Sequence, residues 1–101
     1  MEIEIQSVNQ FNEEIKAPKV LVDFYATWCG PCKMVAPVIE QIAKEHPELK
    51  VLKVDVDEVG ALAMQFGVNS IPTMLYIEDG KVIRSRLGFA PKPVLEEFVG
   101  L

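Results

Sequence analysis

Trp28-Cys29-Gly30-Pro31-Cys32-Lys33 is the stretch that decides the fold, and it contains both cysteines of this 101-residue chain. The residues before it, 20–26, are almost all apolar and predict a strand that is buried on both faces. After it, apolar side chains recur at helical spacing, at Val35, Val38, Ile39 and Ile42. We therefore expect the cysteine pair where a buried strand turns into a helix. A Cys-x-x-Cys pair in that setting is typical of a redox motif.

The two cysteines are suited to different steps of disulfide exchange. The attacking species is the thiolate, and the N-terminus of a helix favours an anion. Cys29 receives this field at the start of the turn, whereas Cys32 is expected to be more buried and less ionised. We expect Cys29 to attack a client disulfide and Cys32 to resolve the mixed disulfide. Pro31 suits the first helical turn, and Gly30 leaves room for an approaching sulfur atom.

Three other roles for the pair are open on the residues alone. A structural disulfide of this spacing would close too short a ring to stabilise the fold much. A zinc site needs four ligands, and the only histidine, His46, lies beyond the predicted helix, so we expect no metal. A buried, inert pair is the third option, and a Gly-Pro spacer on a strand-to-helix turn argues against it.

Size and charge narrow the classes of protein. With half of its residues hydrophobic, the chain is expected to form a single domain over 1–101. The net charge of −5 and the lack of a Lys/Arg run argue against binding to nucleic acid or anionic lipid. Residues 1–5 alternate like a strand rather than a secretory signal, and no apolar run approaches the ~20 residues of a membrane span. We expect a cytoplasmic monomer whose thiols meet a reducing environment.

The remaining elements are predicted from periodicity and turn signals. Residues 2–8 alternate as in an edge strand, and Asn9 is expected to cap a short helix carrying Phe11 and Ile15. The helix after the cysteines should run to Lys44 or Glu45. Further on we expect a strand at 51–56, a helix at 59–66 ended by Gly67, a hairpin of 73–77 and 81–87, and a last helix from Pro91 or Pro93 burying Val94, Leu95 and Phe98, with Leu101 a further candidate. This order predicts an α/β fold with a mixed sheet covered by helices on both faces.

Along essentially its whole length the chain resembles the thioredoxin family. The Cys-Gly-Pro-Cys core, with tryptophan before it and lysine after it, is highly specific within that superfamily. The resemblance rests on residues 22–34, Ala36-Pro37, residues 53–57, Ser70-Ile71-Pro72-Thr73 and Gly88. It implies the thioredoxin fold, a mixed five-stranded sheet of order 1-3-2-4-5 flanked by four helices, and the reduction of protein disulfides.

Asp23 and Lys53 each interrupt an apolar strand, with opposite charges. An unpaired buried carboxylate is costly, so we expect the two to pair; the alternative is that Lys53 points to solvent. The resemblance implies that Asp23 lies beneath Cys32, helps to move its proton through water, and pairs with Lys53. Desolvation disfavours the charged carboxylate, so a raised pKa of Asp23 is predicted.

The Ile71–Pro72 bond would be expected to be trans on the residues alone. The resemblance instead implies a cis bond in a loop that faces Cys29, with the Ile71 backbone pairing with an extended client segment. Gly88, near the same surface, would keep the groove open. The implied substrate-binding patch consists of Trp28, Gly30, Pro31, Ile71, Pro72 and Gly88.

Few positions depart from the family pattern. Tyr25 stands where many members have tryptophan or phenylalanine, a swap from which we expect little consequence. Phe89, bulkier than usual, is expected to shape partner choice. Lys33 is interpreted as a solvated charge rather than a catalytic group.

The sequence as a whole favours a protein disulfide reductase recycled by a separate thioredoxin reductase, NADPH- or ferredoxin-linked. No glycine-rich nucleotide motif is present, so we expect no cofactor and electrons supplied by a partner protein. A dedicated oxidant or isomerase is a rival, disfavoured because such relatives usually carry a histidine in the spacer. The other rival is a non-catalytic binding module in a complex, whose function would survive replacement of both cysteines by serine.

Overall fold

The computed structural model describes residues 1–101, and its strands and helices alternate until the last two strands form a hairpin. None of its helices combines the length and the apolar character needed to cross a membrane. The elements are β1 (Glu2–Glu4), α1 (Val8–Glu14), β2 (Lys19–Tyr25), α2 (Gly30–Glu45), β3 (Lys50–Asp55), α3 (Gly60–Gln65), β4 (Thr73–Glu78), β5 (Lys81–Leu87) and α4 (Lys92–Phe98).

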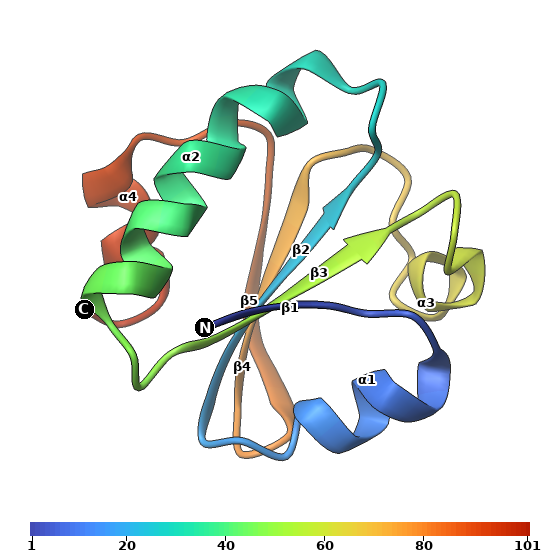
Figure 1. Ribbon diagram of the computed structural model, residues 1–101, viewed down its shortest axis with the longest axis horizontal. Coiled ribbons are helices and arrows are strands. Elements are labelled where there is room, and N and C mark those ends of the chain that lie inside the picture. The colour runs from blue at the N-terminus through green and yellow to red at the C-terminus, as the bar shows by residue number, and fades with distance from the viewer.

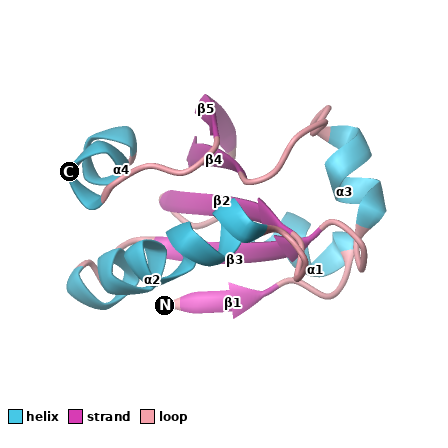
Figure 2. Cartoon of the chain, turned by 90° about the horizontal axis from the view of Figure 1, so that it is seen from above, coloured by secondary structure: helices cyan, strands magenta, loops and turns pink.

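All five strands belong to one mixed sheet in the order β1-β3-β2-β4-β5. The strands β1, β3 and β2 run parallel, and β4 and β5 add antiparallel pairs. Figure 1 shows α2 and α4 on one side of the sheet and α1 and α3 on the other, and Figure 2 shows the strands stacked in their order between these helix pairs. The expected thioredoxin fold is confirmed.

The central strand β2 divides its side chains between two apolar layers. Leu21 packs into the cluster that contains the buried residues of α2 and α4. Val20, Val22 and Phe24 pack into the cluster that contains those of α1 and α3. Because strand side chains alternate, Asp23 lies on the same sheet face as Leu21, the face that α2 covers.

The first strand and the first helix differ from their predicted boundaries. β1 ends at Glu4, and α1 begins at Val8, inside the range predicted to be strand. The cap is Ser7 rather than Asn9, because Ser7 is extended and its Oγ accepts the Gln10 N–H at 3.1 Å. In the sequence, polar and apolar residues therefore keep alternating beyond Glu4, where β1 ends its pairing with β3.

The C-terminal half follows the predicted elements, with one helix face assigned incorrectly. Asp79 and Gly80 both have positive φ, 51° and 81°, as the two-residue hairpin turn requires. In α4, however, Val94 and Leu101 are 37% and 43% exposed. The buried stripe consists of Leu95, Phe98 and Val99, at the i, i+3, i+4 spacing, which turns Val94 away from α2.

Candidate active site

The cysteine pair lies where the chain leaves β2 and enters α2 (Figure 1). Cys29 and Cys32 form a disulfide, with Cα atoms 5.3 Å apart. Cys29 is the N-cap of α2, and its Sγ accepts the backbone N–H of Cys32 at 3.2 Å. In the reduced protein the same N–H and the positive end of the helix dipole would stabilise a thiolate at Cys29.

Burial does not distinguish the two cysteines in the disulfide state. Their exposed fractions are 5% for Cys29 and 4% for Cys32, so the expected difference is hardly present. Both pack with Ala26, and the partly buried side chains around this group are those of Tyr25, Val56 and Ile71. What differs between the two sulfur atoms is their position on the helix: only Cys29 is at its cap.

The two spacer residues occupy the first turn of α2. Pro31 fits there because the N–H that it lacks would have no partner inside the helix. Gly30 is exposed, and a Cβ added to it would meet no other group within 4 Å. The space beside position 30 is therefore open, and glycine leaves it unfilled.

Asp23 and Lys53 meet on the sheet face that α2 covers. They are direct neighbours in the β2–β3 register, and Lys53 Nζ lies 3.7 Å from Asp23 Oδ2. The Lys53 side chain is only 20% exposed and lies over the ring of Tyr25, so it does not point freely to solvent.

Burial dominates the electrostatics of Asp23, which is 1% exposed. Desolvation raises the pKa of Asp23 to about 6, and the nearby charge of Lys53 opposes this rise. Its Oδ1 has no hydrogen-bond partner among the protein groups. Burial therefore makes this carboxyl group harder to ionise than an exposed aspartate, and one of its two oxygens has no partner among the protein groups.

The loop before β4 closes the site on another side. The Ile71–Pro72 bond is cis, as the resemblance implied, and the Ile71 carbonyl oxygen lies 3.8 Å from Cys29 Sγ. Gly88, whose φ is +83°, follows β5 and donates its N–H to the Pro72 carbonyl at 2.8 Å. The left-handed backbone at Gly88 favours glycine, and the hydrogen bond holds the end of β5 against the loop.

Asp57 is a residue of the site that the sequence reasoning did not single out. Trp28 is 68% exposed, yet its indole N–H donates to Asp57 Oδ2 at 2.8 Å. Asp57 in turn donates its backbone N–H to Asp55 Oδ1 at 2.9 Å. The sequence does contain a signal for Asp57, because it lies just after β3. β2 and β3 are parallel, so the residues after β3 lie at the same edge of the sheet as the cysteines after β2.

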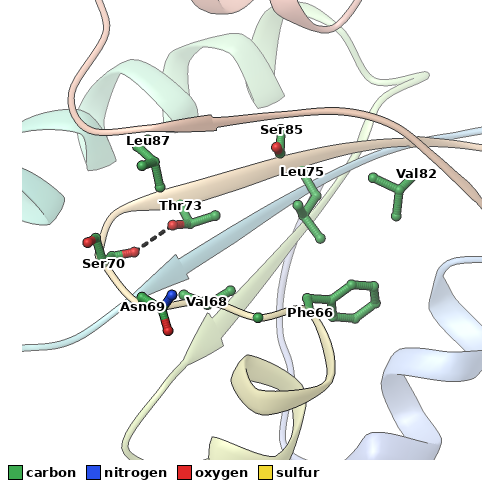
Figure 3. Close-up of a pocket in the computed structure, with 10 residues that line it drawn as sticks. Phe66, Val68, Asn69, Ser70, Thr73, Leu75, Val82, Ser85 and Leu87 are labelled. Carbon is green, nitrogen blue, oxygen red and sulfur yellow. Dashed lines mark hydrogen bonds between the residues drawn. The ribbon is translucent and has the colours of Figure 1, made fainter.

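Two cavities flank the loop that carries Ile71. One, of about 330 Å³, contains Trp28 and Ile71 in its lining and so lies beside the cysteine pair. The other, of about 370 Å³, lies between this loop and β5. Figure 3 shows the hydrogen bond at its edge that the Thr73 hydroxyl donates to the Ser70 carbonyl oxygen. Both are lined by Val68, Asn69 and Ser70, so this segment is the wall between them. Only the first adjoins the redox pair.

His46 lies at the opposite end of α2 from the cysteines, as its C-cap. A helix of 16 residues is about 24 Å long, so His46 and the cysteine pair cannot share a zinc ion. His46 instead lies beside Glu45 and Glu96, both within ion-pair distance of Lys92 Nζ, at 2.7 and 3.6 Å. The Lys92 ammonium group thus already pairs with both carboxylates of this cluster.

Comparison with known proteins agrees with this geometry. The model of the family described as Thioredoxin matches residues 2–100. Thioredoxin of Bacillus subtilis is 49% identical over 90 residues, which cover 88% of this chain and 86% of that protein. Thioredoxin of Listeria monocytogenes is 50% identical over 90 residues, covering 88% and 87% of the two chains.

Solved structures give the same result. The Plasmodium falciparum thioredoxin structure superimposes with a TM-score of 0.88 at 34% identity, covering 95% of this chain and 94% of that one. A mutant thioredoxin from Halobacterium salinarum gives a TM-score of 0.90 at 35% identity, covering 97% and 87%.

Proposed function

Because the chain belongs to the thioredoxin family and is a thiol–disulfide oxidoreductase, we propose that it reduces disulfides of client proteins through Cys29 and Cys32. The Cys29 thiolate attacks one client sulfur, the client disulfide breaks, and the other client sulfur leaves as a thiolate. Cys32 then attacks Cys29, forming the disulfide of the oxidised protein and releasing the second client thiol. Two electrons pass from the cysteine pair to the client.

The single observation that carries this division of roles is the capping geometry. Cys29 Sγ is the group that accepts the Cys32 N–H at the N-terminus of α2. An anion is stabilised there, so Cys29 is the nucleophile and, when the mixed disulfide resolves, the sulfur that is attacked.

Asp23 acts as the base for the resolving step. It takes the thiol proton of Cys32 through water, and the Cys32 thiolate then attacks. Its pKa of about 6 supports this role, because a base is most effective when its pKa lies near the working pH. Lys53 Nζ, 3.7 Å from Asp23 Oδ2, is the charge partner of this carboxylate. It lowers the pKa of Asp23 and so helps the buried group to ionise.

Client segments bind in extended form beside Cys29. The backbone of Ile71 pairs with the client main chain, and the surrounding patch consists of Trp28, Gly30, Pro31, Pro72 and Gly88. This patch recognises main chain and shape more than particular side chains, so we expect broad client tolerance. Asp57 keeps the indole of Trp28 in place at its border.

A separate reductase, either NADPH- or ferredoxin-linked, returns the protein to its dithiol form, so the chain serves as an electron carrier without a cofactor of its own. The net charge of −5 disfavours self-association and so supports a monomer as the working form, which we expect to act in the cytoplasm.

The test is to trap the mixed disulfide. Reduced Cys32→Ser protein mixed with a disulfide-bonded peptide should accumulate a covalent adduct through Cys29, seen by non-reducing electrophoresis and mass spectrometry. The matched variant Cys29→Ser should accumulate much less adduct. Equal trapping by the two variants would contradict the assigned roles. A protein that keeps its cellular function with both cysteines changed to serine would instead be the non-catalytic binding module.

A further inference from the structure

Lys53 lies between two carboxylates on the same sheet face. In the strand register it is directly opposite Glu4 of β1 on one side and Asp23 of β2 on the other. Opposite charges that face each other across neighbouring strands ordinarily attract one another. Yet Lys53 forms an ion pair with Asp23 and none with the more exposed Glu4.

Tyr25 accounts for this choice. Its hydroxyl donates to Glu4 Oε2 at 2.7 Å, and Lys53 Nζ lies 4.7 Å from the centre of its ring. Tyr25 is two residues from Asp23 on β2, so both side chains are on the face that α2 covers. A single side chain thus holds the carboxylate of Glu4 and offers its ring face to the ammonium.

We propose that the Tyr25 hydroxyl is a positioning group that occupies Glu4 and so reserves Lys53 for Asp23. Without the hydroxyl, the Glu4 carboxylate would be free to draw the ammonium across β3, away from Asp23. Tyr25 also packs against the group formed by Ala26, Cys29 and Cys32. Tyr25 therefore contacts both Glu4 of β1 and the cysteine pair. This inference rests on the proposed role of Asp23 as a base. It adds that Glu4, on the edge strand β1, affects the pairing of Asp23 with Lys53.

The charges around Asp23 agree with this arrangement. Besides burial, which raises its pKa most, Lys53 of β3 lowers it, and Glu2 and Glu4 of β1 raise it. Among the titratable residues of α2, Cys32 is the buried one. Burial and the Glu4 carboxylate raise the pKa of the Tyr25 hydroxyl above its ordinary value of 10.0, so it remains a donor throughout the working pH range.

The experiment compares Tyr25→Phe with Glu4→Gln by NMR titration of the Asp23 carboxyl carbon in the oxidised protein, with Asp23→Asn to assign the signal. Tyr25→Phe should raise the pKa of Asp23 by about half a unit, roughly threefold tighter proton binding, because Glu4 competes for Lys53. Glu4→Gln should lower it, because a negative charge is removed. The double variant should behave like Glu4→Gln.

Tyr76→Phe is the matched control. Tyr76 also donates to a glutamate, Glu78 at 2.6 Å, and also has a cation, Arg84, over its ring, but it lies on β4. This variant should leave the Asp23 titration unchanged. An unchanged titration in Tyr25→Phe, or shifts of the same sign in Tyr25→Phe and Glu4→Gln, would overturn the proposal. If Tyr25→Phe fails to fold, the double variant matching Glu4→Gln supports it, and a double variant that differs overturns it.

A second readout separates this inference from the proposed function. The pH dependence of the rate of mixed-disulfide resolution should move with the Asp23 pKa, to higher pH in Tyr25→Phe and to lower pH in Glu4→Gln. A profile that stays fixed while the NMR titration shifts would contradict the role of Asp23 as base and leave the role of Tyr25 intact. Since the titration uses the oxidised protein, it needs no activity.

Discussion

At the scale of single residues, position 23 holds a carboxylate 1% exposed within a central strand. One of its oxygens has no hydrogen-bond partner, and the ammonium of Lys53 lies 3.7 Å from the other. Ionising such a group in the folded state is unfavourable. The residue therefore lowers stability at neutral pH, and under the proposed mechanism it is retained because Cys32 needs a base.

Asp23→Asn should raise the free energy of unfolding at pH 7, by on the order of 2–3 kcal/mol. The folded-state pKa of about 6 exceeds the ordinary 3.8, so the folded protein binds the proton more tightly than the unfolded chain. Wild-type stability should therefore fall as pH rises from about 4 through about 6. Denaturant unfolding of both proteins over this pH range measures the effect, and a difference that does not vary with pH would contradict it.

Residues 25 and 57 show where single-residue reasoning was insufficient. From the sequence, Tyr25 is an aromatic swap of little expected consequence, because the sequence does not show that Glu4 comes within 2.7 Å of its hydroxyl. Asp57 belongs to the stretch that carries the family resemblance, but the sequence does not show that it accepts a hydrogen bond from the Trp28 indole. Both contacts join segments far apart in the chain, and they arise only once the strand order is known.

At the scale of elements, local signals predicted the structure well where only one signal acted. The helix after the cysteines follows from apolar side chains at helical spacing. The hairpin follows from the Asp79-Gly80 dipeptide, and both of its residues have the positive φ that such a turn requires. At residues 5–8 two signals compete, strand-like alternation and a capping serine, and the cap prevails. In α4 the buried face depends on where α2 lies, which periodicity alone does not give.

The correction at α1 can be tested directly. Ser7→Ala should reduce the free energy of unfolding by about 1 kcal/mol, because the Gln10 N–H loses its acceptor. Asn9→Ala is the matched control: Asn9 lies inside α1 and is exposed, so its replacement should have little effect. Thermal or denaturant unfolding distinguishes the two. A larger loss in Asn9→Ala would restore the cap that the sequence predicted.

At the scale of the whole molecule, the sheet order brings distant segments to one site. β2 leads to the cysteines, β3 supplies Lys53 and the acidic turn that holds Trp28, and Gly88 follows β5. Periodicity predicts these elements but not their order, which came from the family resemblance. The site residues could therefore be named from motifs, while the contacts among them required the fold.

The measurement that bears most directly on the proposed function is the reduction potential of the Cys29–Cys32 pair. Trp28, the only tryptophan, is next to the pair and provides a fluorescence signal in defined thiol–disulfide buffers. For a protein disulfide reductase we expect a value near that of thioredoxin, about −270 mV. A value above about −200 mV would indicate an oxidant or isomerase, and a pair that never equilibrates with the buffer would indicate a binding module; either result would contradict the proposed function.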